Sequence, residues 1–182
     1  MVIDILGPNL ELMFDYCERS FSLKTILMLA LQCVSRMETM HEKGFIHRDI
    51  KPENFLAGIG KRSHIVYSID FGLVKRYIDP KSGKHIHFKE NRGMIGTVRY
   101  ASLGAQKGNE QSRRDDLEAV GFMLCYFIRK GTLPWMGLKV KRAQKAEMLT
   151  KLKQETTFEA LLEGHPIEFV DYMTYVRGLG FE

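Results

Sequence analysis

Residues 70–100 form a long stretch without sustained hydrophobic periodicity, and this stretch separates two segments with clear helical patterns. A loop of this length in a compact domain is usually functional or disordered. Before it, Ser22 is an N-cap signal and Gly44 a stop signal for one helix. Between them, apolar residues recur at steps of three and four, namely Leu23, Ile26, Leu27, Ala30, Val34 and Met37. After the loop, residues 117–128 are apolar on most sides, which predicts a central helix.

The composition is that of one ordinary globular domain. The chain has 182 residues, of which 45% are hydrophobic and 27% charged. These values exclude a disordered tail, a collagen-like fibre and a disulfide-stapled miniprotein. The net charge of +5 is a mild excess that does not by itself indicate nucleic-acid binding. The excess is local, because residues 129–153 contain 8 basic residues and 1 acidic residue, whereas the rest contains 19 basic and 21 acidic residues.

The remaining elements are predicted to be short strands around the loops and two further helices. The strands are expected at residues 45–46, 55–56 and 65–69. The first residues also predict a buried strand that needs sheet neighbours, formed by Val2, Ile3, Ile5 and Leu6. A basic helix is expected over residues 139–153, and a last helix has Pro166 near its start.

The N-terminal sequence and the cysteines predict an intracellular protein. The N-terminus does not have the basic and apolar regions of a signal peptide, and no apolar stretch reaches the length of a membrane span. Cys33 and Cys125 lie in apolar helical runs and are expected to be core thiols. We therefore expect the protein in the cytoplasm, with the nucleus as a second location if the basic cluster serves nuclear import.

The decisive motif is the run from His47 to Asn54, which reads HRDIKPEN. It matches the HRDxxxxN catalytic loop of protein kinases at each fixed position. Phosphoryl transfer needs a carboxylate near the attacking hydroxyl, a cation on the moving group, and ligands for Mg²⁺. Asp49 fits the first role, Lys51 the second and Asn54 part of the third. Sixteen residues after Asn54, Asp70-Phe71-Gly72 supplies a second oxygen ligand suited to Mg²⁺.

The whole chain resembles the C-terminal lobe of protein kinases of the casein kinase I family. The motifs that carry this resemblance are LGP at 6–8, FSLKT at 21–25, HRDIKPENFL at 47–56, IDFGL at 69–73, GTVRYAS at 96–102, QSRRDDLE at 111–118 and LPW at 133–135. The resemblance implies an α+β family in which this chain is the mainly helical lobe, with short β-hairpins around the catalytic loop. Residues 1–9 would be the interlobe hinge and residues 10–182 the C-terminal lobe without its last helix. No Gly-rich loop and no ATP-binding strand lysine precede the catalytic loop.

The resemblance also assigns binding roles. Leu6 would offer hinge backbone groups to the adenine of ATP and Asp4 a hinge carbonyl, whereas Leu56 and Ile69 would form the apolar floor beneath the base. Asp116 resembles the central-helix aspartate that holds the backbone of the catalytic loop. The alternative for Asp116 is an acidic residue that stabilises the start of a helix.

A second set of residues resembles the site where this family recognises a phosphoserine or an acidic residue upstream of its target. The set consists of Arg99, Gly137 and Lys145, and an arginine fork with a nearby lysine suits a phosphate. The alternative for Lys145 and the neighbouring basic residues is a solvated helix face. The sequence His85-Ile86-His87 offers two metal ligands without a cysteine, so we expect a mobile loop beside the substrate rather than a zinc site.

Two functions follow from the resemblance. The first is a Ser/Thr protein kinase that uses ATP and Mg²⁺ on acidic or phospho-primed protein substrates, with this chain weak or inactive alone. The second is a non-catalytic module that docks acidic or phosphorylated proteins. Neither involves nucleic acid or a membrane span, and the oligomeric state is left open. We also expect marginal folding of the isolated chain, because the strand at residues 2–6 would lack sheet partners.

Overall fold

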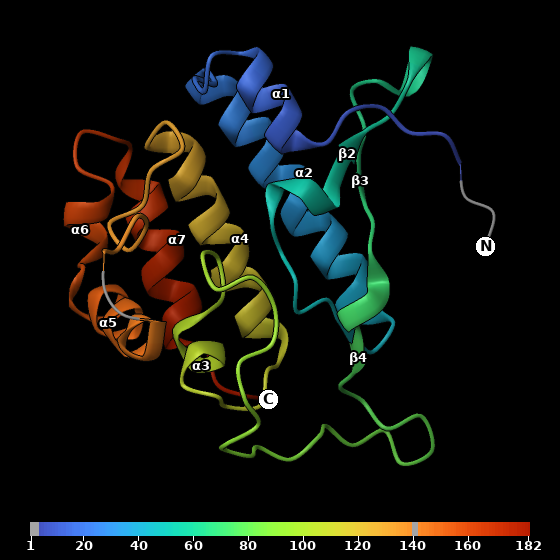
Figure 1. Cartoon of the computed structure of the whole chain (residues 1–182). Helices are drawn as coiled ribbons and strands as arrows, with labels where there is room; N and C mark the ends of the chain where they lie inside the picture. The colour runs from blue at the N-terminus through green and yellow to red at the C-terminus, as the bar shows by residue number, and fades with distance from the viewer. Residues whose placement is uncertain (1–3, 140–141) are drawn as a thin grey trace.

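The computed structural model describes residues 4–139 and 142–182, with the side chains of all of these except residues 142, 143 and 145. Three helices form the core: α2 (Leu23–Glu42), α4 (Arg113–Ile128) and α7 (Ile167–Gly178). Helix α4 lies in the middle, with α2 on one side and α7 on the other (Figure 1). The long loop of residues 77–102 first runs below the ends of α2 and α4 and then returns to the catalytic loop, where Thr97 contacts Asp49 (Figure 1).

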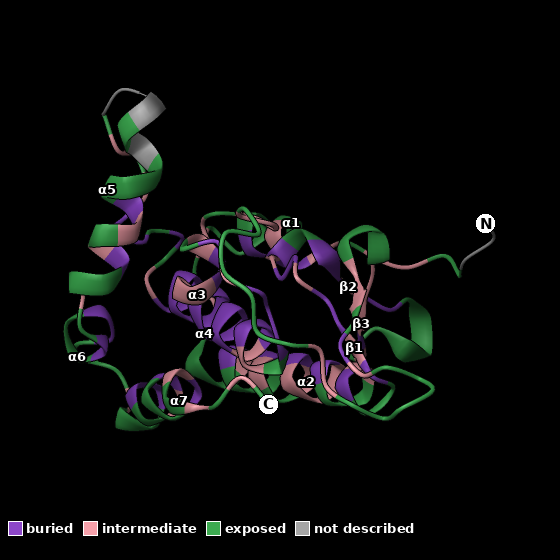
Figure 2. Ribbon diagram, turned by 90° about the horizontal axis from the view of Figure 1, so that it is seen from below, coloured by how far each residue is buried: buried purple, intermediate pink, exposed green. Residues whose placement is uncertain are grey.

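Helix α4 is central, as its sequence predicts. Of its 16 residues, 13 are buried, and Figure 2 shows it as the most continuous buried element. Gly121 allows α7 to approach closely, because a Cβ at this position would overlap the Met173 sulfur. Pro166 caps α7, whose buried side chains are Phe169, Val170, Met173 and Val176.

Helix α2 has the predicted bounds, but of the predicted apolar residues only Ile26 and Met37 are fully buried. The Ser22 hydroxyl accepts a bond from the Thr25 amide at 3.1 Å, and the chain leaves the helix before Gly44, which has φ +80°. The stripe against α4 contains Ile26, Leu29, Cys33 and Met37. Leu27, Ala30 and Val34 instead line an open groove of about 620 Å³ between α2 and α7. Helix α2 is therefore apolar on two faces, which a single periodicity does not distinguish.

Four short strands form two antiparallel pairs around the catalytic loop, and one of these pairs is a hairpin. Three of the strands were predicted, whereas the fourth lies in the stretch that was predicted to be irregular. β1 (Phe45–Ile46) pairs antiparallel with β4 (Lys75–Arg76), in the register Phe45 opposite Arg76. β2 (Phe55–Ala57) pairs antiparallel with β3 (Val66–Ser68), with Leu56 opposite Tyr67. Residues 47–54 connect the two pairs, so both ends of this segment are fixed by backbone hydrogen bonds.

The predicted N-terminal strand is not present where it can be checked. Val2 and Ile3 lie outside the described residues, but Ile5 is 82% exposed, and residues 4–8 have no regular structure. The chain instead runs beside β2, where Gly7 donates to the Ala57 carbonyl at 2.8 Å and Pro8 accepts from the Ala57 amide at 3.0 Å. The prediction of a buried strand was wrong for Ile5, because only backbone groups pair here and no second layer covers the side chains.

The other helices are less evident from periodicity. Helix α5 was expected over residues 139–153 and is found at Arg142–Glu155. Three short helices were not predicted: α1 (Leu10–Tyr16), α3 (Leu103–Gln106) and α6 (Phe158–Leu161). Single 3₁₀ turns lie at Pro52–Asn54, Gly60–Arg62 and Phe71–Leu73. Among the described residues, none of the helices has the length and apolar character that crossing a bilayer requires.

The cysteines agree with the expected core thiols. Cys33 and Cys125 are free and buried, and burial raises the pKa of each thiol to about 12. Both therefore stay protonated at neutral pH.

Candidate active site

Asp49 is the centre of the site, in the loop between β1 and β2. Its carboxylate is buried and accepts three side-chain hydrogen bonds: from Thr97 Oγ1 at 2.7 Å, Lys51 Nζ at 2.7 Å and Asn54 Nδ2 at 3.3 Å. Burial alone would raise the pKa of Asp49, but the bonds from Lys51, Thr97 and Asn54 outweigh it, and the pKa lies below its ordinary value. The bond to Asp49 in turn raises the pKa of Lys51. Asp49 is therefore an oriented, ionised acceptor at neutral pH.

Asp116 lies beneath this loop and holds its backbone. It is 1% exposed, and its carboxylate accepts from the His47 amide at 2.7 Å and from the Arg48 amide at 2.8 Å. These bonds fix the turn at Arg48, which has φ +68°. The geometry favours the loop-holding role over the alternative of a helix-start charge.

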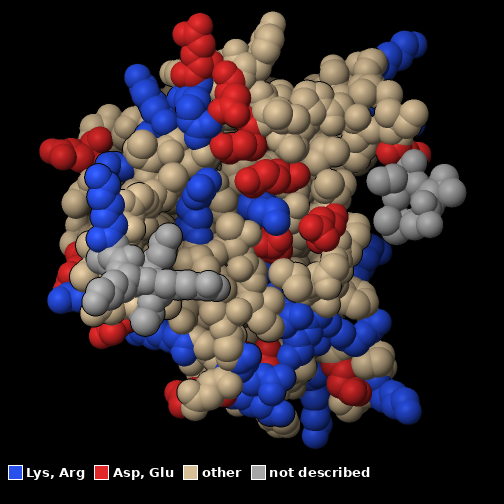
Figure 3. Space-filling view, in the orientation of Figure 1, with Lys and Arg blue, Asp and Glu red and all other residues tan. Residues whose placement is uncertain are grey.

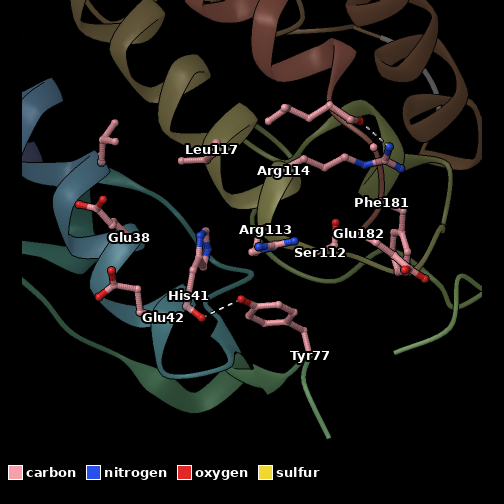
Figure 4. A pocket seen from close by; sticks show the side chains of 13 residues that line it. Glu38, His41, Glu42, Tyr77, Ser112, Arg113, Arg114, Leu117, Phe181 and Glu182 are labelled. Atoms are coloured by element: carbon pink, nitrogen blue, oxygen red, sulfur yellow. Dashed lines mark hydrogen bonds between the residues drawn. The ribbon is translucent and has the colours of Figure 1, made fainter. Parts of the chain in front are cut away.

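His41 extends the network behind Asp116. Its Nε2 lies 2.9 Å from Asp116 Oδ2, and the Tyr77 hydroxyl donates to the His41 carbonyl at 2.7 Å. Figure 4 shows this second bond at the edge of a cavity of about 590 Å³ behind the catalytic loop. The network thus joins α2, α4 and the segment after β4.

Asn54 and Asp70 are brought together by the β2–β3 hairpin. The Ile69 amide donates to the Asn54 carbonyl at 2.9 Å, which places Asp70 beside Asn54. Asp70 is exposed and has φ +61°, and its carboxylate accepts from the Gly72 amide at 3.3 Å. Asn54 donates its Nδ2 to the Asp49 carbonyl at 2.8 Å, so its amide oxygen is the atom available as a ligand.

This pair fits a magnesium ion. One amide oxygen and one carboxylate are hard oxygen donors, and Mg²⁺ in phosphoryl-transfer sites takes few protein ligands beside water and phosphate oxygens. Over residues 4–139 and 142–182, we find no group of three or more His, Cys, Asp and Glu side chains arranged for a metal. His85, from the sequence His85-Ile86-His87, packs its ring against Tyr77 and Phe181 at centroid distances of 5.2 and 4.9 Å.

The four residues expected around adenine are only partly brought together. A cavity of about 410 Å³ beside the β2–β3 hairpin is lined by Asp4 and Leu6 but not by Leu56 or Ile69. Leu56 lies in the middle of β2, where it pairs with Tyr67 and forms a bridge to Asn9. Of the four residues, Asp4 and Leu6 therefore share a cavity that Leu56 and Ile69 do not line.

Arg99 is the best-defined member of the expected phosphate site. Its guanidinium lies over the rings of Tyr100 and Tyr126, at 5.6 and 5.5 Å from their centroids, and it donates to the Tyr100 hydroxyl at 3.3 Å. Gly137 is exposed, with φ +69°. The side chain of Lys145 lies outside the described residues. The aromatic rings hold the Arg99 fork in place before any ligand binds.

Two functional contacts were missed by sequence reasoning. Thr97, inside the motif GTVRYAS, contacts Asp49, and the motif itself was the only signal for it. Lys153 was counted with the basic helix but is 1% exposed, with its ammonium turned inward. Nothing in the sequence separates Lys153 from the exposed lysines around it, so the basic surface near Arg99 is smaller than its composition predicts.

The comparison with known families agrees with this geometry. Residues 2–173 match the family model described as a protein kinase domain. The match covers nearly the whole chain, and the mainly helical fold with short strand pairs around residues 47–54 is that of a kinase C-terminal lobe. The chain therefore belongs to the protein kinase family.

Proposed function

We propose that this chain is the catalytic-loop lobe of a Ser/Thr kinase of casein kinase I type, which transfers the γ-phosphoryl group of ATP to acidic or phospho-primed proteins. The observation that carries the proposal is the carboxylate of Asp49, which Lys51, Thr97 and Asn54 hold in one orientation. An aligned carboxylate beside a lysine is the arrangement that phosphoryl transfer to a hydroxyl requires.

Each residue of the site has a separate role in the proposed transfer. Asp49 aligns the substrate hydroxyl and accepts its proton, while Lys51 stabilises negative charge on the transferring group. Asn54 and Asp70 would hold the metal through their oxygens. Mg²⁺ and ATP, when bound, supply the phosphoryl group and neutralise its developing charge. Because the pKa of Asp49 is lowered, the carboxylate stays ionised well below neutral pH.

The substrate class rests on the family motifs, on Arg99 and on the distribution of charge. Figure 3 shows Lys and Arg side chains gathered over the long loop that follows β4 and beside α5. The loop contributes exposed basic residues, among them Lys81, Lys84, Lys89 and Arg92. A substrate with acidic or phosphorylated residues complements these charges.

A second candidate function is a docking module without catalysis. The observation that favours it is the preformed setting of Arg99, which needs neither ATP nor a second lobe. A rise in melting temperature with a phosphoserine peptide, and none with Mg-ATP, would favour this module over the kinase.

The catalytic proposal predicts a large loss of activity for Asp49→Asn. The chain contains no Gly-rich loop before His47, so we expect little or no phosphate transfer from it alone. Joined to the N-terminal lobe of a casein kinase I, it should phosphorylate an acidic peptide in the presence of Mg-ATP. Asp49→Asn should then reduce kcat by about 10²–10⁴-fold, because the amide cannot accept the proton.

The matched control is Asp171→Asn, the same change at an exposed position on α7. It should leave transfer unchanged. Equal activity of the Asp49→Asn enzyme and the control would disprove the assigned role of Asp49. Strong transfer by the chain alone, abolished by Asp49→Asn, would contradict the expectation that it needs a second lobe.

Arg99→Ala tests the preference for primed substrates. In the joined enzyme, we expect kcat/KM for a phospho-primed peptide to fall about tenfold or more, since a charge-assisted bond to phosphate is lost. The value for the unprimed acidic peptide should change far less. Lys24→Ala, at an exposed basic residue in the first turn of α2, is the control. A parallel fall for both peptides would contradict phosphate recognition by Arg99.

A further inference from the structure

Lys153 is a buried lysine on α5, a helix whose other described lysine, Lys151, is exposed. Lys153 is 1% exposed, and its Nζ donates to the Ala101 carbonyl at 2.6 Å and to the Val98 carbonyl at 3.1 Å. The ammonium also lies 4.7 Å from the ring centre of Phe122 and 5.1 Å from that of Trp135. Lysine is almost never fully buried unless it is paired, so these contacts define a specific position for it.

The two carbonyls belong to the turn of residues 97–101, which carries both functional side chains of this segment. Within the turn, the amides of Tyr100 and Ala101 donate to the Thr97 carbonyl, each at 3.0 Å. The Arg99 carbonyl between the two lysine-bound groups accepts from Trp135 Nε1 at 2.9 Å. The carbonyls of this turn are thus held by side chains from α5 and from the segment after α4, and the Val98 carbonyl also accepts from Gln106 Nε2 of α3 at 3.0 Å.

Two side chains of this turn, Thr97 and Arg99, belong to the candidate site. The Thr97 hydroxyl donates to Asp49 at 2.7 Å, and Arg99 is stacked on Tyr100 and Tyr126. We propose that Lys153 is a positioning residue, which fixes this turn so that Thr97 meets the catalytic carboxylate and Arg99 faces the substrate. The part of the inference that concerns Arg99 rests on the proposed function, whereas the part that concerns the turn does not.

A lysine suits this task in either protonation state. Burial lowers the pKa of Lys153 to about 7, an effect that Glu118 of α4 opposes and Arg177 of α7 strengthens. Glu118 and Arg177 form an ion pair with each other at 2.7 Å. The ammonium has three N–H donors and the neutral amine two, so the bonds to Val98 and Ala101 can persist on either side of the titration.

Lys153→Met tests the inference, because methionine keeps the length and apolar stem but has no donor. In the full 182-residue chain, we expect amide hydrogen exchange of residues 97–101 to become about tenfold faster or more. Emission of Trp135, the single tryptophan, should change as well. The affinity for a phosphoserine peptide should fall about tenfold, with a smaller change for the unphosphorylated acidic peptide.

The matched control is Lys151→Met, which removes a lysine that is 65% exposed on the same helix. It should leave exchange, emission and affinity unchanged. If Lys153→Met folds and residues 97–101 exchange as in the wild type, the inference is overturned. If the wild type binds neither peptide, the phosphate-reading part of the proposed function fails, and the exchange result still decides the role of Lys153.

A measurement on the wild type covers the case in which Lys153→Met does not fold. In a sample with labelled lysine side chains, the Nζ protons of Lys153 should exchange with water far more slowly than those of Lys151 and show contacts to residues 98 and 101. Equal exchange of the two lysines would overturn the inference.

The pH dependence of stability gives a further check. The ordinary pKa of lysine is 10.5, so between pH 7 and pH 10.5 the unfolded chain binds more protons at Lys153 than the folded protein. This residue therefore makes the wild type gain stability relative to Lys153→Met as the pH rises through that window. A stability difference that stays constant from pH 7 to pH 9 would contradict the lowered pKa of Lys153, and the exchange of residues 97–101 would then decide the inference.

Discussion

Asp116→Asn should lower the free energy of unfolding by about 3–5 kcal/mol and disorder the catalytic loop. Asparagine has the size of aspartate, but it replaces one acceptor oxygen by a donor. The wild-type carboxylate accepts from the His47 and Arg48 amides and contacts His41 Nε2 in a buried setting. The new side-chain NH₂ would then face the backbone N–H of His47 or Arg48, so that one buried donor has no acceptor. No water is expected to replace it, because the side chain is 1% exposed.

Urea unfolding monitored by circular dichroism would measure this loss. Asp171→Asn is the control, because the same atoms change at an exposed site on α7. We expect it to alter stability by less than about 0.5 kcal/mol. Similar stabilities for Asp116→Asn and the control would mean that the Asp116 bonds do not hold the loop.

Gly96→Ala should have the second large effect, a loss of about 3 kcal/mol together with displacement of Thr97 from Asp49. Gly96 has φ +100°, and a Cβ there would overlap the Arg48 carbonyl oxygen. That oxygen belongs to the catalytic loop itself, so the strain can be relieved only if the loop or the segment before Thr97 moves. Activity of the joined enzyme should therefore fall along with stability.

Gly83→Ala is a control that separates the two sources of strain at Gly96, which are the left-handed backbone and the overlap with the Arg48 carbonyl. Gly83 has φ +68°, but no atom lies within 4 Å of the Cβ that alanine would add. We expect a loss of about 1 kcal/mol, from the left-handed backbone alone, and unchanged phosphate transfer. Thermal melts and peptide assays on both variants would check this, and an equal effect at both positions would contradict the close contact between Gly96 and Arg48.

The sequence predicted the elements that local patterns determine. Helices α2, α4 and α7 have long apolar repeats, and strands β1, β2 and β3 have β-forming residues next to polar loops. Strand β4 was not predicted, because its two residues, Lys75 and Arg76, carry no strand pattern. Asp49, Lys51 and Asn54 could be proposed as site residues because the catalytic-loop motif has a fixed spacing. Asp70 followed from its distance to Asn54, and the hairpin places these two side by side, since Ile69 pairs with Asn54.

The features that escaped prediction depend on contacts between distant residues. Ile5 belongs to a segment rich in β-branched residues, which predicts a buried strand. Its exposure depends instead on whether other elements of the fold cover its side chain. Lys153 lies in a basic helix, and only the position of the turn at residues 97–101 explains why its side chain is buried. The short helix α1 has too few residues for a periodic signal, although Asn9 accepts from the Leu12 amide as an N-cap.

The bonds of Asp116 have a consequence for the order of folding. They join Asp116 to His47, which is 69 positions away in the chain, and to His41, which is 75 positions away. The catalytic loop therefore cannot take its final shape from local sequence, and it must wait until α4 has docked against α2. Closing so long a stretch of chain is entropically costly and belongs to a late, cooperative step. Intermediates that precede this step would contain the catalytic residues but not the site, which makes activity a direct report of complete folding.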